Sequence, residues 1–335
     1  MSKSITIKDI AREAGVSIAL VSFVMNNRIE ADGKQKYRVS EETKRRILDV
    51  ASRMNYRPSS AARMLRQGRT HVIGVILSDL SNIFYGIIAK ELEDQATRHG
   101  YTVLFGSSEE DPERFARLVR SFMEKDVEGF IVVPAAGSAR SVEGLIASGK
   151  PFVVIDRYHP DYDVPSVLVD NKGAMKMAIE ALQGMGARKI GMISYAMRIS
   201  SMTDREESFR EIAGDDAPIY HLPFQNTREG AEQAADDIVR RGLDGIISAS
   251  NVPSVLIIKA LLKRGIHIQK DIRMVGFDYS NVYDIFEPRI PYILQPLPQI
   301  AAQSAEYLFG LIDAKQKGED IAQKKDKIIL NASLI

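Results

Sequence analysis

The spacing of apolar residues divides the chain into a short helical N-terminal segment and a longer stretch in which apolar runs alternate with amphipathic helices. In the first segment four apolar residues recur at helical spacing, and these are Ile7, Ile10, Ala11 and Ala14. Thr6 stands where an N-cap is expected, Gly15 can adopt the positive φ of a sharp turn, and Ser17 can cap a second helix. The pattern predicts two short helices around a tight turn, which is the layout of a DNA-reading helix-turn-helix. An ordinary helical hairpin remains the alternative.

The second helix is predicted to bury Val21, Val24 and Met25. Four residues are then left on the outer face, which would enter a major groove: Ile18, Ala19, Ser22 and Phe23. A polar, glycine-interrupted loop follows at Ile29–Arg38, which either reaches a phosphate or stays mobile.

A third helix is expected to open at Ser40, with Glu41 and Glu42 in its first turn, and Pro58 stops it. Residues 59–65 can form about two further helical turns, too short a helix to be stable alone in water. Its order is therefore expected to depend on a partner.

From His71 onward the pattern predicts about ten buried strands, separated by helices. The strands are expected at 72–77, 101–105, 129–133, 152–155, 167–169, 190–194, 219–222, 245–248, 274–277 and 292–294. Helices are expected, for example, at 84–98, 115–124, 173–184, 229–241, 254–264 and 299–313. Ten strands exceed one small doubly wound sheet, so we expect two lobes of about five parallel strands, joined near Asp170 and Gln295.

Charge separates the same two regions. Residues 1–70 hold 15 Lys and Arg against 7 Asp and Glu, whereas the other residues hold 30 against 37, so a formal net charge of +1 hides a basic and an acidic part. The basic part suits phosphate neutralisation, although a solvated basic face is the simpler reading of charge alone. The absence of cysteine suits a reducing cytoplasm, and we find neither a secretion signal nor a membrane span.

Several motifs together resemble the lactose-repressor (LacI/GalR) family of bacterial transcription regulators. They are Thr6–Ser17, Val21-Ser22, Tyr56–Ser59, Ala62–Leu65, Ile73–Val75, Asn82–Tyr85, Val275–Asp278 and Gln295-Pro296. The resemblance implies an all-α helix-turn-helix headpiece (1–58), a hinge helix and linker (59–70), and an α/β two-lobed core with parallel sheets like periplasmic sugar-binding proteins (71–335). We place lobe 1 at about 71–169 and 296–325, and lobe 2 at about 170–295 and 326–335.

The resemblance also carries over DNA-contacting positions. Backbone contacts are expected from Thr6, Ser17, Ser22 and Asn26; base contacts from Ile18, Ala19 and Phe23; and hinge contacts from Ala62, Arg63 and Leu65. The three base readers depart from the family's polar choices, so we expect packing on the thymine methyl, unless specificity has shifted to the hinge. Leu65 matches the leucine that the family wedges into the minor groove.

Ligands of two-lobed α/β proteins sit at the carboxyl ends of the strands. Residues there, together with two positions carried over from the family, form the predicted effector site: Asp79, Asn82, Phe84, Tyr85, Arg157, Arg205, Phe224, Asn251, Asp278 and Gln295. Carboxylates, arginines and an aromatic ring suit a sugar, and a purine would use nearly the same groups. Asn251 replaces an acid common at its position.

We therefore expect a cytoplasmic, homodimeric regulator that binds a palindromic operator on double-stranded DNA. It would repress a carbohydrate-utilisation operon and be gated by a sugar, as inducer or corepressor, or alternatively by a purine or nucleoside. The lack of a heptad tail favours a dimer over a tetramer. A sugar-transport binding protein is the weaker rival, because it would need a secretion signal. We find no cofactor fingerprint, metal-ligand spacing or nucleophile, so neither an enzyme, a cofactor nor a metal site is expected.

Overall fold

The computed structural model describes residues 5–25, 39–56, 68–322 and 324–335. The chain divides into two compact units, Met1–Thr70 and His71–Ile335. Among the described residues, the helices lack the combination of length and apolarity that a membrane crossing requires.

The described residues of the N-terminal unit form three helices, and capping residues account for several of their ends. They are α1 (Ile7–Ala14), α2 (Ile18–Met25) and α3 (Glu41–Arg53). Thr6 precedes α1 and donates from its N–H and Oγ1 to Asp9 Oδ2, at 3.0 and 2.7 Å. Gly15 ends α1 at a φ of 63°, and Ser17 Oγ accepts from the Leu20 N–H at 3.1 Å, so the predicted turn and cap are confirmed. Ser40 caps α3 in the same way, through the Thr43 N–H at 3.2 Å.

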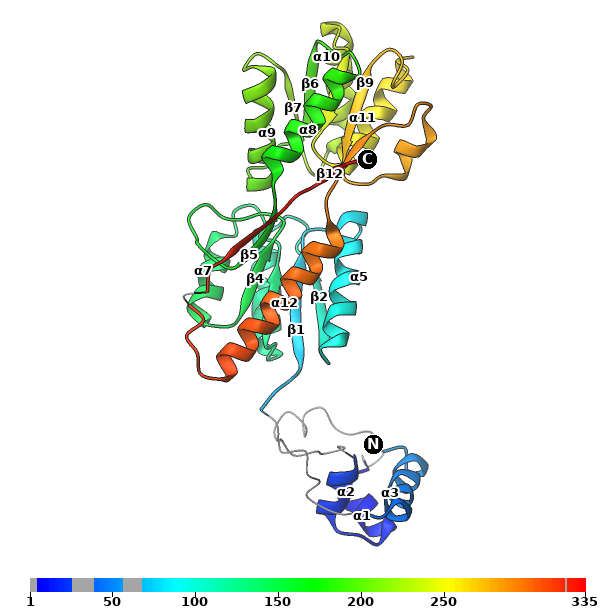
Figure 1. The fold of residues 1–335 in the computed structure, drawn as a ribbon, viewed down its shortest axis with the longest axis vertical. Coiled ribbons are helices and arrows are strands. Elements are labelled where there is room, and N and C mark those ends of the chain that lie inside the picture. The colour runs from blue at the N-terminus through cyan, green and yellow to red at the C-terminus, as the bar shows by residue number, and fades with distance from the viewer. Residues whose placement is uncertain (1–4, 26–38, 57–67, 323) are drawn as a thin grey trace. The chain divides into compact units, whose positions relative to one another are not determined.

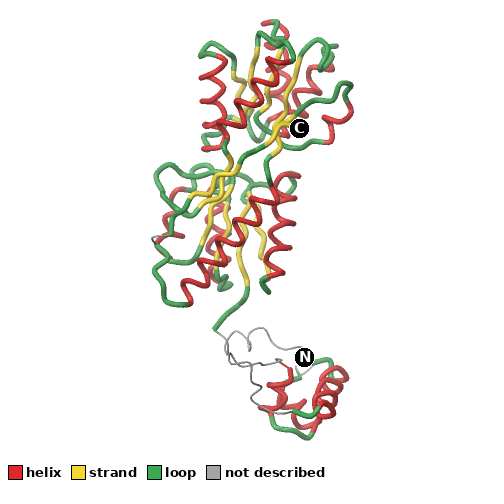
Figure 2. The backbone as a smooth tube through the Cα atoms, viewed as in Figure 1, coloured by secondary structure: helices red, strands yellow, loops and turns green. Residues whose placement is uncertain are grey.

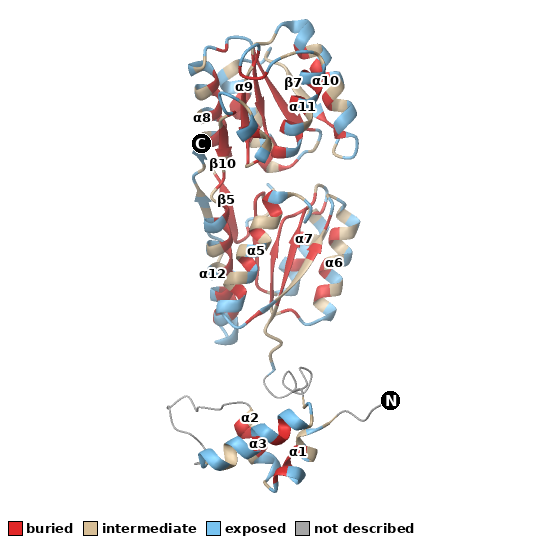
Figure 3. Cartoon of the chain, turned by 90° about the vertical axis from the view of Figure 1, so that its right-hand side faces the viewer, coloured by how far each residue is buried: buried red, intermediate tan, exposed pale blue. Residues whose placement is uncertain are grey.

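The first lobe of the larger unit is a six-stranded, all-parallel sheet with the order β11-β5-β4-β3-β1-β2. Its strands are β1 (Val72–Leu77), β2 (Thr102–Ser107), β3 (Gly129–Val132), β4 (Phe152–Ile155), β5 (Ser166–Val169) and β11 (Lys327–Leu330). Helices α5 (Ile83–Arg98) and α12 (Leu297–Gln316) cover one face, and α6 (Pro112–Glu124) and α7 (Ala139–Ser148) cover the other (Figures 1 and 3). The inner strands β1, β3, β4 and β5 are buried on both faces, which explains their continuous apolar runs (Figure 3).

The second lobe repeats this plan with the strand order β12-β10-β9-β8-β6-β7. Its strands are β6 (Ile190–Tyr195), β7 (Ile219–Leu222), β8 (Gly245–Ser248), β9 (Arg273–Phe277), β10 (Tyr292–Leu294) and β12 (Ser333–Leu334). Helices α8 (Asn171–Gly184) and α9 (Ser200–Ala213) pack on one face, and α10 (Thr227–Arg241) and α11 (Asn251–Lys263) on the other. A short 3-10 helix, η1 (Asn281–Ile285), follows β9.

The C-terminal segment departs from the prediction. The prediction that residues 326–335 belong to the second lobe is wrong for β11, which pairs in parallel with β5 and belongs to the first sheet. Only β12 reaches the second sheet, where it pairs antiparallel with β10. The chain therefore passes between the lobes a third time, between Leu330 and Ser333, in addition to the predicted passages near Asp170 and Gln295 (Figure 2). Strand pairing is set by partners distant in sequence, so the short apolar run at 328–330 did not reveal its sheet.

Candidate functional site

The helix-turn-helix presents a small outer surface at the start of α2. Ile18 is 48% exposed, and Ser17 and Ala19 are exposed beside it. Thr6 is exposed next to α1, and Ser22 is half-buried. The turn thus exposes four of the residues predicted to meet DNA, and the hydroxyl groups of Thr6 and Ser17 also serve the helix ends.

Phe23 corrects the predicted reading face, because its ring is buried rather than turned outward. It is 9% exposed and belongs to the apolar core of this unit, which includes Val21 on α2 and Ile47 and Val50 on α3. Apart from Ser22, every residue of α2 is apolar, so the pattern alone did not show how the helix is rotated. Burial of the large aromatic ring is favourable, and it rotates α2 so that Phe23 packs in the core. Four other predicted DNA contacts, Asn26, Ala62, Arg63 and Leu65, lie outside the described residues, as does the loop Ile29–Arg38.

A cavity of about 290 Å³ lies in the larger unit, between its two lobes. The lobes meet with the carboxyl ends of their parallel strands toward each other, so the loops after β1, β4, β6 and β9 all contribute to its wall. Nine of the ten predicted effector residues line it: Asp79, Asn82, Phe84, Tyr85, Arg157, Arg205, Phe224, Asp278 and Gln295. Its volume is at the lower end of the range for small-molecule sites, roughly 300–1,000 Å³.

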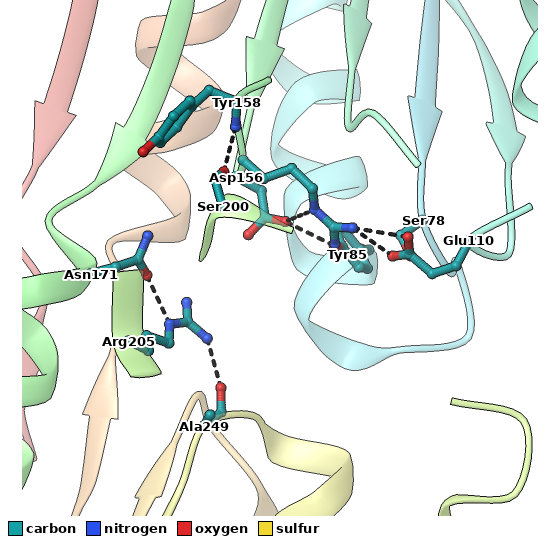
Figure 4. Close-up of polar contacts among 10 residues, drawn as sticks. Ser78, Tyr85, Glu110, Asp156, Tyr158, Asn171, Ser200, Arg205 and Ala249 are labelled. Atoms are coloured by element: carbon teal, nitrogen blue, oxygen red, sulfur yellow. Dashed lines mark hydrogen bonds and ion pairs between the residues drawn. The ribbon is translucent and has the colours of Figure 1, made fainter. Parts of the chain in front are cut away.

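The first-lobe wall is organised around Arg157, which is buried just after β4. Its Nε donates to Asp156 Oδ2 at 3.0 Å, and its Nη1 donates to both carboxylate oxygens of Glu110, at 2.8 and 2.9 Å. Its Nη2 donates to the Tyr85 hydroxyl at 2.8 Å, and that hydroxyl donates in turn to Asp156 at 3.1 Å. Burial opposes the charge on Arg157, but its acidic partners outweigh burial and raise its pKa. This group is a rigid, charge-paired wall (Figure 4).

The second-lobe wall is organised around Arg205, which projects from α9 and is 2% exposed. Its Nε donates to Asn171 Oδ1 at 2.8 Å and its Nη1 to the Ala249 carbonyl at 2.7 Å, as Figure 4 shows. The guanidinium carbon lies 3.7 Å from the centre of the Phe277 ring. Burial lowers the pKa of Arg205, and its direct partners are all uncharged.

Asp278 and Gln295 complete the cavity at the ends of β9 and β10. Gln295 Nε2 donates to Asp278 Oδ1 at 2.7 Å, and both side chains are buried. Burial raises the pKa of the Asp278 carboxyl to about 6, against the opposing effect of Arg205. Three acidic residues of the cavity adopt a positive φ: Glu110 at 57°, Asp156 at 69° and Asp278 at 63°. Left-handed backbone at non-glycine residues is typical of functional sites.

Asn251 differs from its predicted role, because it is absent from the described residues that line the cavity. Its Nδ2 donates to Asn82 Oδ1 at 2.9 Å, across the two lobes. A second contact between the lobes joins the Tyr158 N–H to Ser200 Oγ at 2.8 Å, and the Tyr158 hydroxyl lies 3.3 Å from Asp204 Oδ1. These hydrogen bonds hold the lobes together beside the cavity.

Sequence reasoning missed a second group of lining residues. They are Ser78, Glu110, Asp156, Tyr195, Met197, Ile199, Ser201, Met202, Thr227, Ser250 and Val252. Glu110 lies in the loop after β2, three residues beyond the end of the strand. Tyr195 ends β6 and pairs with the Phe224 ring, with centroids 5.7 Å apart. The strand-end rule, applied to every strand, would have found both.

The cavity brings charged, hydrogen-bonding side chains together with aromatic rings, and this combination suits the binding of a polar ring. Within the described part of the chain, no cluster of His, Asp and Glu side chains has metal-binding geometry. A helix-turn-helix followed by a two-lobed core around such a cavity defines a ligand-responsive DNA-binding regulator.

Comparisons with known proteins agree with this class. The family of bacterial regulatory proteins of the lacI type matches residues 6–59, and the periplasmic binding protein domain matches residues 73–316. The chain is 30% identical to the ribose operon repressor of Halalkalibacterium halodurans over 92% of this chain and 91% of that protein. It is 28% identical to catabolite control protein A of Staphylococcus epidermidis, over 89% and 90%.

Solved structures show the same fold. The lac repressor dimer bound to operator and an anti-inducer superposes with a TM-score of 0.84 at 19% identity, covering 99% of this chain and 98% of that one. A LacI family regulator from Enterococcus faecalis V583 with bound ribose gives 0.68 at 20% identity, covering 79% and 96%. The chain belongs to the LacI family of bacterial transcription regulators.

Proposed function

We propose that the protein is a cytoplasmic, homodimeric repressor of a carbohydrate-utilisation operon, gated by a sugar bound between the lobes of its core. The observation that supports a sugar as the effector is the composition of the cavity wall. Asp156 and Asp278 offer hydrogen-bond acceptors there, and Arg205 offers a donor beside aromatic rings. Sugar hydroxyls both donate and accept, and their apolar ring faces pack on aromatic side chains. The ribose operon repressor among the relatives supports the same class of effector.

For DNA we propose that Ile18 and Ala19 read bases, while Thr6, Ser17 and Ser22 position the helix on the phosphate backbone. Exposure of the first turn of α2 supports this assignment. Phe23 is withdrawn as a base reader because its ring is buried. The hinge contacts of Ala62, Arg63 and Leu65 stay predictions.

The contacts between the lobes would couple effector binding to DNA binding. A ligand that closes the lobes changes the equilibrium between two core states, and operator affinity follows if the DNA-binding form prefers one of them. An inducer lowers operator affinity and a corepressor raises it, so the titration of operator affinity described below distinguishes the two.

The experiment starts with selection of operator DNA from a random library by the full-length protein. Operator affinity is then titrated with and without sugars chosen by thermal shift, with nucleosides as the alternative class. We expect one sugar to change operator affinity about 5- to 150-fold. Arg205→Lys should abolish that response, because lysine cannot reproduce the fork to Asn171 and Ala249. Arg210→Lys, on the exposed side of the same helix, is the matched control. A response to nucleosides and not to sugars would overturn the assignment.

A further inference from the structure

The charges that line the cavity are unbalanced toward the negative. The described lining residues include four acids, which are Asp79, Glu110, Asp156 and Asp278. They include two cations, which are Arg157 and Arg205. Among the described lining residues there is neither a lysine nor a histidine. A ligand therefore meets a wall with more acceptors than positive charges.

Arg157 is already neutralised by the protein. Asp156 holds its Nε, while both oxygens of Glu110 receive its Nη1. Glu110 is 5% exposed at its side chain and also accepts from the Ser78 hydroxyl. Among the described residues of the first-lobe wall, the one cation is thus held between two carboxylates, which weakens its attraction for an anionic ligand.

Among the described residues that line the cavity, Arg205 is the one cation whose hydrogen-bond partners are uncharged. Asp278, Asp156 and the other acids of the wall surround the same small cavity, so an entering anion would gain one attraction and meet several repulsions in a poorly solvated space. An uncharged hydroxyl group has no such penalty, because it donates to the carboxylates and accepts from Arg205.

We propose that the cavity selects uncharged sugars against their phosphate esters, and that Glu110 is the residue that sets this selectivity by occupying Arg157. The inference rests on the proposed function, since it concerns which sugars the cavity admits. The left-handed backbone of Glu110, at a φ of 57°, places its carboxylate on Arg157 from the loop after β2. Glu110 acts through Arg157 and is a specificity-determining residue.

The test is isothermal titration of the full-length protein with matched probes: ribose and ribose 5-phosphate, glucose and glucose 6-phosphate, and inorganic phosphate alone. We expect an uncharged sugar to bind at least tenfold tighter than its phosphate ester, and inorganic phosphate not to bind. Glu110→Gln removes the negative charge beside Arg157. The ratio of the affinity for the sugar to the affinity for its phosphate ester should then fall at least tenfold. Glu113→Gln, which removes the same charge from the exposed start of α6, should leave the preference unchanged.

Glu110→Asp separates the loss of the charge from a disturbed fold. It keeps a carboxylate beside Arg157, so it should retain more of the preference for the uncharged sugar than Glu110→Gln does. A phosphate ester that binds wild-type protein as tightly as its sugar would overturn the inference and leave the proposed sugar effector standing. If no sugar or ester binds, the proposed effector class fails and the selectivity between them fails with it. Inorganic phosphate that binds the wild-type protein and not Arg205→Lys would overturn the exclusion of anions by itself.

Discussion

Single residues in the cavity carry charge in an environment that opposes it. Asp278 is buried, and its amide partner Gln295 offers one hydrogen bond to the carboxylate. Burial has the larger effect and raises the pKa of Asp278 from the usual 3.8 to about 6. The folded state thus tolerates a protonated Asp278 better than an ionised one.

This predicts a pH-dependent effect of Asp278→Asn. In the wild type, the favourable contribution of protonated Asp278 is fully present below about pH 4 and is lost as the pH rises through about 6. The variant lacks this titration. The free energy of unfolding of the variant minus that of the wild type should therefore rise from pH 4.5 to pH 7.5, by on the order of 2 kcal/mol. Urea unfolding at the two pH values measures the difference. A constant difference would show that Asp278 does not titrate in this range.

The two ends of α2 predict opposite consequences for two apolar residues. Phe23→Ala should destabilise the N-terminal unit by about 3–5 kcal/mol, because it empties part of a packed core. Ile18→Ala should change stability by less than about 0.5 kcal/mol, since its side chain is 48% exposed, and yet weaken operator binding several-fold. Hydrogen exchange of α1–α3 in the full-length protein measures the first effect, and DNA titration the second. Equal operator affinity for wild type and Ile18→Ala would exclude base reading by Ile18.

At the scale of elements, the start of α9 and the end of β4 form a contact between lobes. Ser200 begins α9, and its Oγ accepts the N–H of Tyr158, three residues after β4. A hydroxyl on one lobe thereby satisfies a backbone donor on the other. The contact stabilises the arrangement in which the cavity lies between the lobes.

Ser200→Ala should weaken effector binding about fivefold, which corresponds to roughly 1 kcal/mol for one hydrogen bond. Tyr158→Phe is the control, because it removes only the longer bond to Asp204 and keeps the backbone N–H on Ser200. Calorimetric titration with the identified effector compares the two. A larger loss in Tyr158→Phe than in Ser200→Ala would assign the contact to the ring hydroxyl instead.

For the whole molecule, charge is partitioned between the two units. A formal net charge of +1 combines a basic stretch of 70 residues with an acidic remainder. The basic unit suits the phosphate backbone, and the cavity of the acidic unit suits an uncharged ligand.

Salt should therefore separate the two binding reactions. The logarithm of operator affinity is expected to fall linearly with the logarithm of salt concentration, by about 0.9 for each phosphate contacted, while sugar affinity changes little. Fluorescence titrations between 50 and 200 mM KCl, roughly the range in which such slopes are measured, test both in one preparation. A sugar affinity as steep in salt as the DNA affinity would contradict an uncharged ligand.

Local sequence pattern was sufficient to predict the helices, most of the strands and nine of the residues that line the cavity. Apolar periodicity located the strands because burial on both faces requires continuous apolar runs, and glycine and serine at positions 15 and 17 predicted the turn because few residues suit its backbone. Strand ends identified Asp79, Arg157 and Asp278 because parallel strands end at one edge.

The tertiary structure decided the rest, since it depends on neighbours that are distant along the chain. It placed β11 in the first sheet, turned Phe23 into the core and withdrew Asn251 from the cavity wall. It also brought Glu110 onto Arg157, 47 residues away in sequence. Local sequence pattern indicates which residues are buried or cap a helix. Which strand or side chain each residue contacts depends on the free energy of packing and charge pairing in the folded chain.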